Sequence, residues 1–173
     1  STSVCEGSSL TISGTDLLNA SSVTIGATAA TITSNTSTDI IVTVGDGTTG
    51  TLNVITPGGN DDYGSPITVT AAPDAGTLTG TEAVCMGGST TFYTDGDVGG
   101  SWSSASVSVA TINSSGIITP VSAGSSLVTY TVNGTGVCSG TDATANRTVT
   151  VNSLPTLSVN SSTVCSGTNA NVT

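Results

Sequence analysis

One short motif recurs along the chain at a fixed interval. Positions 3–12 read SVCEGSSLTI, positions 83–92 read AVCMGGSTTF, and positions 163–173 read TVCSGTNANVT. Cys5, Cys85 and Cys165 are therefore 80 residues apart in both steps. A period of this size indicates a repeated unit long enough for a small β-sandwich. We expect two units and the start of a third, within a longer tandem array or one repeat of a fibre.

Alternating apolar residues predict β-strands along the whole chain. In LVTYTV, Val128, Tyr130 and Val132 fall on one face, which is the period of two of a half-buried strand. The run DIIVTV at 39–44 repeats this pattern, and clusters of Gly, Asn, Asp and Pro separate such runs. No amphipathic pattern of helix length occurs. Short strands with frequent turns predict an all-β fold built from antiparallel sandwiches.

The charge balance excludes two classes of partner. The chain has one Lys or Arg against eleven Asp and Glu, which gives a formal net charge of −10. Nucleic acids and anionic membranes are bound through clustered cations, so we expect neither as a partner. No stretch is apolar for long enough to predict membrane insertion.

Cysteine is the expected covalent supplement to a thin core. The chain has only one Trp, three Tyr and one Phe, and a fold with so little aromatic area gains from a cross-link. Cys85 and Cys138 flank the second unit, and we predict a disulfide between them, hence an oxidising, extracellular location. Cys5 and Cys165 are expected to be unpaired or joined to residues outside this segment. Zinc is not expected, because there is no CxxC pair and no His.

Two stretches resemble known domain families. Positions 8–70 resemble an IPT/TIG domain, an Ig-like fold, through SSLTISGTDLLNASSVTIGATAATI, TDIIVTV and TGTLNVITPGG in that order. Positions 76–151 resemble a group-2 bacterial Ig-like domain through GGSWSSASVSVATINSSGIITPVSAGSSLVTYTV. This second resemblance implies that Trp102 is the core tryptophan, and the strand pattern adds Tyr130 to the predicted core.

These resemblances imply a domain plan of tandem Ig-like antiparallel β-sandwiches. An IPT/TIG-like sandwich is expected at 1–72, a group-2 bacterial Ig-like sandwich at 73–152, and the first strands of a further Ig-like or PKD-like repeat at 153–173. The cysteine pair departs from the usual group-2 pattern and resembles variants in secreted proteins of the Bacteroidota. The implied context is a surface adhesin or filament of that group, on the cell surface.

Candidate chemistry is sparse. Catalysis is not expected, because the chain has no His and no Lys, which removes the common general bases and Schiff-base chemistry. Calcium is the alternative to consider, since Asp95 and Asp97, or Asp61 and Asp62, could supply hard oxygen ligands. The other interpretation is that these acids occupy turns, where Asp tolerates and caps tight backbone geometry. No other cofactor is predicted.

Three functions fit the sequence. The first is a non-catalytic structural segment of an extracellular stalk, adhesin or filament, whose partners are neighbouring repeats of the chain or identical subunits in a fibre. The second is a binding module whose loops recognise a surface glycan or protein. The third is an accessory domain of a secreted enzyme. Many further copies of the repeat would favour the first, and an appended catalytic domain the third.

Overall fold

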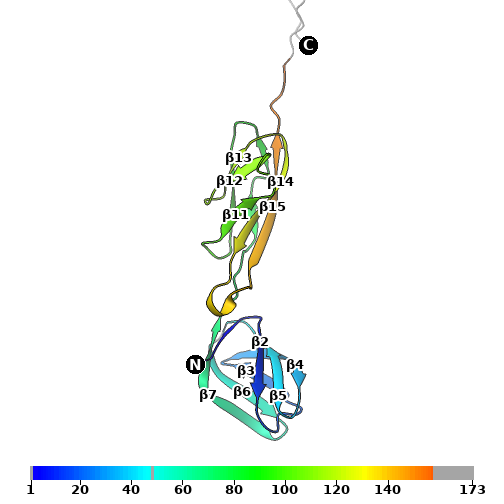
Figure 1. Ribbon diagram of the computed structural model, residues 1–173, viewed down its shortest axis with the longest axis vertical. Helices are drawn as coiled ribbons and strands as arrows, with labels where there is room; N and C mark the ends of the chain where they lie inside the picture. Colours follow the sequence, from blue (N-terminus) through cyan, green and yellow to red (C-terminus); the bar gives the residue numbers. More distant parts are fainter. Residues whose placement is uncertain (1, 48, 158–173) are drawn as a thin grey trace, which may run out of the picture.

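Two β-rich units lie end to end along the long axis of the molecule (Figure 1). The computed structural model describes residues 2–47 and 49–157. The first unit holds strands β1 to β7, and the second holds β8 to β15 with one short 3-10 turn. The all-β prediction is confirmed. The repeat predicted at 153–173 falls mostly outside the described residues, and Cys165 falls wholly outside them.

Seven strands form the described part of the first unit. They are β1 (Ser3–Cys5), β2 (Ser9–Ser13), β3 (Ser22–Ile25), β4 (Thr28–Asn35), β5 (Asp39–Thr43), β6 (Gly50–Thr56) and β7 (Gly59–Thr70).

The strand β4 joins the two layers of this unit. The strands follow one another in the order β1-β7-β6-β3-β4-β5-β2. Residues 28–30 of β4 pair with β3, whereas the residues from Thr31 onward pair with β5, and the register shifts between Ile32 and Ser34. A bulge of this kind bends a strand and increases its twist. As a result, β2 and β5 pack across the core from β3, β6 and β7, as in an Ig-like sandwich.

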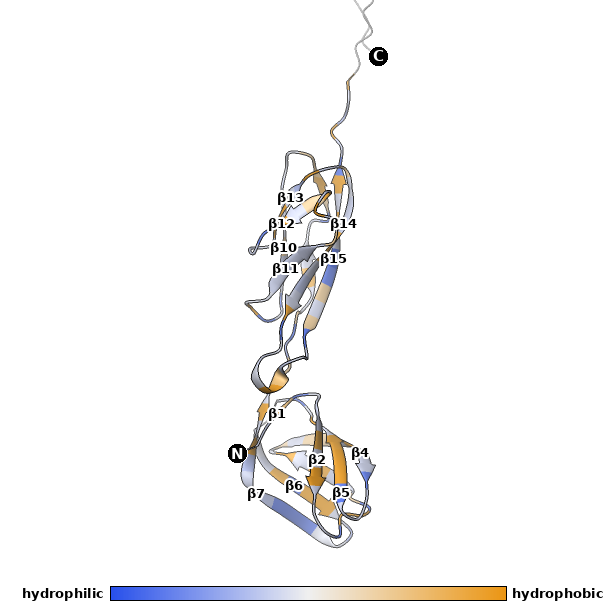
Figure 2. Cartoon of the chain, in the orientation of Figure 1, coloured by the Kyte–Doolittle hydropathy of each residue, from blue (hydrophilic) through white to orange (hydrophobic). Residues whose placement is uncertain are grey.

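The core of the first unit is aliphatic and follows the period-two pattern. On β5, Ile40 and Val42 are fully buried while Ile41 between them is half-buried. The first eight residues of β7 are exposed and hydrophilic, and only Ile67 and Val69 on that strand reach the core (Figure 2). Burial of apolar side chains is the dominant favourable term in folding. This domain therefore depends on many small side chains rather than on aromatic anchors.

Eight strands form the second unit. They are β8 (Leu78–Gly80), β9 (Ala83–Cys85), β10 (Thr90–Thr94), β11 (Ser101–Ser104), β12 (Ala110–Ile112), β13 (Ile117–Pro120), β14 (Gly124–Val132) and β15 (Ala143–Asn152). They make two four-stranded sheets, ordered β12-β13-β10-β8 and β11-β14-β15-β9.

The second unit is stabilised by an aromatic pair within one sheet and by polar contacts between its two sheets. Tyr130 is buried, and its ring centroid lies 4.7 Å from that of Trp102, which is half-buried between two core clusters. Arg147 reaches from β15 across the edge of the sandwich and donates to the carbonyl oxygens of Leu78 and Gly80 at 2.7 and 3.0 Å. It also pairs with Glu82 at 3.2 Å. These contacts hold β8 against the opposite sheet.

Asp39 illustrates how surface hydroxyls stabilise an edge of the first unit. The Ser13 hydroxyl donates to its Oδ1 at 2.7 Å and the Thr38 hydroxyl to its Oδ2 at 2.8 Å. Because these bonds favour the ionised carboxylate, and Ser13 contributes most, the pKa of Asp39 lies below its ordinary value. The stability that this carboxylate adds is present above the unfolded-state pKa and is lost as the pH falls through the lower folded-state pKa.

We predict that Ser13→Ala raises the pKa of Asp39 toward its ordinary value, because the hydrogen bond that lowers this pKa most is removed. Carboxyl-carbon NMR titration measures the shift directly, and Thr38→Val serves as the matched variant with a smaller effect. An unchanged titration curve for Asp39 in the Ser13 variant would contradict this cause.

Candidate functional site at the junction between the units

The first half of the junction is the end of strand β1. This strand runs parallel to β7, with Cys5 beside Thr70, the last residue of β7. The Glu6 amide donates to the Thr70 carbonyl at 2.9 Å, so the turn after Cys5 is fixed to the point where the chain leaves the first unit. Cys5 is only 2% exposed. The strand pairing thus delivers the Cys5 sulfur to the face that meets the second unit.

The second half of the junction is the long connection between β14 and β15. It includes a 3-10 turn, Gly136–Cys138, and Figure 1 shows this connection reaching toward the first unit. The Thr141 hydroxyl donates to the Cys138 carbonyl at 2.6 Å, and the Gly134 amide donates to Asp142 at 3.1 Å. A Cβ on Gly134 would collide with the Cys138 carbonyl oxygen. The loop is therefore folded tightly around Cys138.

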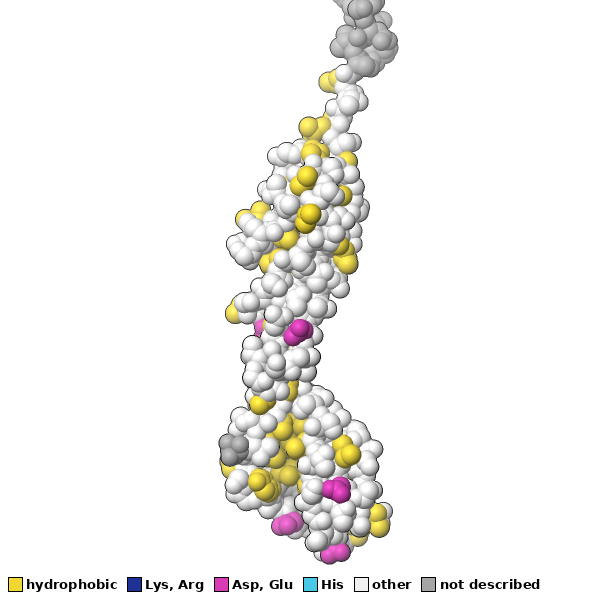
Figure 3. Space-filling model, in the orientation of Figure 1, with side chains coloured by type: hydrophobic (Ala, Val, Ile, Leu, Met, Phe, Trp, Pro, Cys, Tyr) yellow, Lys and Arg dark blue, Asp and Glu magenta, His cyan; other side chains and the backbone are white. Residues whose placement is uncertain are grey.

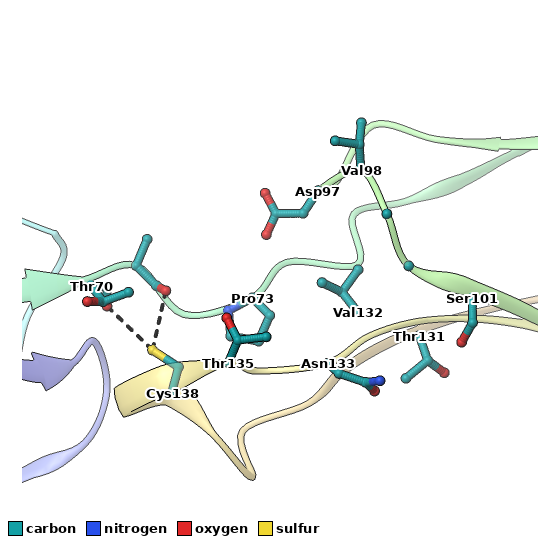
Figure 4. A pocket seen from close by; sticks show the side chains of 13 residues that line it. Thr70, Pro73, Asp97, Val98, Ser101, Thr131, Val132, Asn133, Thr135 and Cys138 are labelled. Atoms are coloured by element: carbon teal, nitrogen blue, oxygen red, sulfur yellow. Dashed lines mark hydrogen bonds between the residues drawn. The ribbon is translucent and has the colours of Figure 1, made fainter.

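A disulfide joins the two units across this junction. It links Cys5 to Cys138, whose Cα atoms are 5.0 Å apart at a sequence separation of 133. The Cys138 sulfur also lies 3.7 Å from the Thr70 carbonyl oxygen and 3.4 Å from that of Ala71, the two contacts drawn as dashed lines in Figure 4. A sulfur in a disulfide carries no hydrogen, so we treat both as close contacts rather than hydrogen bonds.

The predicted Cys85–Cys138 disulfide is wrong. Cys85 is exposed and unpaired among the described residues. It lies beside Asn152 at the end of β15, whereas Cys138 precedes the start of that strand at Ala143. A strand of this length spans roughly 30 Å at the usual rise per residue, and cysteines whose Cα atoms are more than about 7 Å apart cannot be bridged without backbone movement. Cys85 and Cys138 flank the second unit in sequence, but they lie at opposite ends of it in space.

The linker between the units is held by acidic side chains of the second unit. Asp97 accepts from the Asp74 amide at 2.9 Å, and its own amide donates to the Asp74 carbonyl at 2.8 Å. Asp95 accepts from the Thr77 amide at 2.6 Å, and the Asp74 side chain accepts from the Gly76 amide at 2.8 Å. Three amides of the linker thereby gain carboxylate acceptors, which form stronger hydrogen bonds than neutral ones.

A close approach between two glycines explains part of the linker geometry. Gly76 has φ of +62° and faces Gly96, where a Cβ on either residue would collide with the backbone of the other. The linker also buries Ala75 beside Leu78 and Tyr130 in the core of the second unit. On the other side, the Ala72 amide donates to Glu6 of the first unit at 3.4 Å. The linker is therefore fixed to both units.

The four predicted calcium ligands lie in two separate places with other hydrogen-bonding roles. Asp95 and Asp97 cap the linker. Asp61 and Asp62 lie on the exposed part of β7, where Asp62 accepts from the Asn53 side-chain amide at 2.6 Å and Asp61 accepts from the Asp62 amide at 3.0 Å. In the part of the chain that the structure describes, no three His, Cys, Asp or Glu side chains converge. Calcium binding stays a prediction from the sequence.

We predict that Asp97→Ala loosens the linker, because the Asp74 amide loses its charged acceptor, at a cost of roughly 1 kcal/mol. Amide hydrogen exchange at Asp74 and the urea midpoint of the second unit measure the effect. Asp97→Asn is the matched control, since its side-chain oxygen can still accept. Equal exchange rates in the alanine variant and the parent would contradict the capping role.

A hollow of about 560 Å³ lies beside the bridge, between the linker and the loops of the second unit (Figure 4). Asp97 is the acidic residue among those that line it, and its carboxylate already accepts from the linker. The lining is otherwise small and polar or aliphatic. Such a surface lacks the aromatic platform and convergent polar groups typical of a small-molecule site.

The charged side chains visible on one face of the molecule are all acidic. On the face drawn in Figure 3, Asp and Glu side chains appear near the junction and at the far end of the first unit, and no Lys, Arg or His side chain is visible.

None of the helical segments in the described residues is both long and apolar enough to cross a membrane.

Sequence reasoning missed Cys5 as the partner of Cys138. The signal was present: Cys5 and Cys85 hold equivalent positions in the repeat, yet residues 6–72 contain no second cysteine. Cys5 therefore cannot form a disulfide within the first unit. A disulfide to the next unit is the pairing that every copy of the motif could form in the same way. The two predicted core residues, in contrast, lie together, with Tyr130 buried and Trp102 packed against it.

Comparison with solved structures gives several matches of low sequence identity. The Bacteroides ovatus mixed-linkage glucan utilization locus SGBP-B, in complex with a mixed-linkage heptasaccharide, is 17% identical, with a TM-score of 0.30, over 87% of this chain and 43% of that one. The four N-terminal Ig domains of Dscam1 isoform 9.44 are 11% identical, with a TM-score of 0.33, over 87% and 42%. Domains 4 and 5 of the S-layer protein SbsC are 18% identical, with a TM-score of 0.28, over 72% and 66%.

This chain spans less than half the length of the first two of these proteins. No curated protein matches the sequence. One family model matches the part of the chain that forms the first unit. Residues 1–72 match the IPT/TIG domain.

Proposed function

We propose that this chain is a non-catalytic structural segment of an extracellular bacterial surface adhesin, stalk or filament. The observation that carries the proposal is the Cys5–Cys138 disulfide, which joins two successive units rather than the two sheets of one unit. A bridge in this position adds little to ligand recognition. It limits the bending and separation of neighbouring units, which is the property that a spacer needs.

Two further observations support this role. The linker amides are capped by Asp74, Asp95 and Asp97, so the connection has few free hydrogen-bonding groups that would favour alternative conformations. The net charge of −10 disfavours collapse of one segment onto another. A disulfide also persists only in an oxidising environment, which agrees with an extracellular location.

Small-angle X-ray scattering of the 173-residue chain tests the proposal. The oxidised chain should give one elongated profile that the end-to-end arrangement reproduces, and reduction should broaden the distribution of interatomic distances. The double variant Cys5→Ser/Cys138→Ser should behave like the reduced chain. A compact or broad profile in the oxidised chain would contradict a spacer function.

A further inference from the structure

Cys85 occupies the same structural position as Cys5, one unit further along the chain. Strand β9 runs parallel to β15 and places Cys85 beside Asn152, the last residue of β15, as β1 places Cys5 beside Thr70, the last residue of β7. The correspondence lies in the backbone pairing and so does not depend on the sequence repeat that first indicated it.

The turns that follow the two cysteines also match. The residue after each cysteine donates its amide to the end of the neighbouring strand, at 2.9 Å from Glu6 to Thr70 and at 3.0 Å from Met86 to Asn152. The third residue after each cysteine donates back to the cysteine carbonyl, at 3.1 Å to Cys5 and at 3.0 Å to Cys85. Cys85 thus has the backbone setting from which Cys5 reaches the following unit.

The environments of the two sulfurs differ in one respect. Cys5 is buried because the turn containing Cys138 covers it, whereas Cys85 is exposed. The chain leaves β15 beside Cys85, at the end of the second unit opposite the first unit (Figure 1). The exposed thiol therefore points to the place where the next unit of a tandem array would begin.

The segment after β15 supplies an independent sign of a following unit. Pro73 comes three residues after the end of β7, and Pro155 comes three residues after the end of β15. Five residues after the same strand ends lie Ala75, which is 3% exposed in the core of the second unit, and Leu157, which is 93% exposed. Leu157 is thus an apolar side chain at the position where the first linker inserts one into the next core.

We propose that Cys85 forms a disulfide with a cysteine in the turn before the last strand of the following unit, so that the bridge between Cys5 and Cys138 is repeated at each junction. The inference rests on the proposed function, because it assumes that a further unit follows. Its partner is the counterpart of Cys138 and lies in the chain beyond residue 173. Leu157 would be buried in the same following unit.

Formation of this bond requires an oxidant of the protein disulfide class. The Cys85 thiolate attacks a sulfur of the oxidant's disulfide, which releases one thiolate of the oxidant and forms a mixed disulfide. The partner cysteine's thiolate then displaces the second thiolate of the oxidant, and the Cys85 sulfur becomes bonded to the partner. The two cysteines lose two protons and two electrons, and the oxidant becomes a dithiol.

The experiment is peptide mapping under non-reducing conditions of the natural protein that extends through the following unit, after alkylation with iodoacetamide. We expect a Cys85 peptide linked to a cysteine of the following unit, with no alkylation of Cys85. In the 173-residue chain, Cys85 should instead be alkylated while Cys5 and Cys138 are protected. Alkylated Cys85 in the longer chain, or Cys85 linked to Cys165 or to a second copy, would overturn the inference.

Two matched variants keep the test informative. Cys85→Ser in the longer chain should leave one newly alkylated cysteine in the following unit, just as Cys5→Ser should leave Cys138 alkylated. The same maps separate the two proposals. Loss of the Cys5–Cys138 peptide in the unmutated protein would count against the spacer function, whereas an intact Cys5–Cys138 peptide with alkylated Cys85 would count against only the repeated bridge.

Discussion

When the oxidised chain is stretched from its two ends, we expect most of its contour length not to be released. Force enters near Ser1, crosses the disulfide from Cys5 to Cys138, and leaves through β15. The 133-residue separation between the two cysteines corresponds, at about 3.4 Å per extended residue, to roughly 450 Å of chain that cannot be released while the bond is intact. The covalent loop contains strands β2 to β7 of the first unit and β8 to β14 of the second.

Single-molecule force spectroscopy with and without a reductant measures this difference. Reduction should add roughly 450 Å of releasable length, by the usual span of an extended residue, and the Cys5→Ser/Cys138→Ser variant should show the long extension in both conditions. The variant Cys85→Ser/Cys165→Ser is the matched control and should keep the reductant-dependent gain. Full extension of the oxidised parent chain, with no change on reduction, would show that the bridge does not carry the load.

Reduction should also lower the free energy of unfolding. In the chain-entropy treatment, a bond that closes a loop of 133 residues restricts the unfolded chain by about 5 kcal/mol at 25 °C. That free energy refers to unfolding of both units together, since the loop encloses residues of each. If one unit unfolds alone, the unfolded part of the loop is shorter and the effect on that transition is smaller.

Urea unfolding followed by circular dichroism, in oxidised and reduced chains, tests this expectation. The midpoints should fall on reduction, and the two units should unfold more independently once the bond is absent, so a single two-state fit should fail. Cys85→Ser is the matched control, because Cys85 is exposed and unpaired in the described part of the chain. Identical midpoints before and after reduction would mean that the bond restricts the unfolded chain far less than its loop length implies.

The strand pattern could be predicted from the sequence because it depends on neighbouring residues. The alternation in DIIVTV buries Ile40, Val42 and Val44, and the alternation in LVTYTV buries Val128, Tyr130 and Val132. Each side chain faces the core or the solvent according to a period that is readable over a few residues. The all-β class and the succession of two sandwich-like units follow from such patterns together with the spacing of the cysteine motif.

The roles of the acids depended on the placement of residues far apart in the chain. Asp95 and Asp97 could have been calcium ligands or turn residues on sequence grounds. The structure brings them to the linker, where their carboxylates accept from the Asp74 and Thr77 amides. That arrangement depends on how residues 74–77 lie against the end of β10, about 20 residues later in the chain, and no local pattern encodes it.

By itself the sequence determined that the chain forms β-strands of alternating burial, in units that recur every 80 residues and carry few charges. Only the tertiary structure decided that Cys138 bonds to Cys5 and leaves Cys85 exposed. The physical reason is geometric. A disulfide forms between cysteines whose Cα atoms come within a few ångströms, and the ends of strands that meet at a junction depend on strand direction and on the docking of one unit against the next.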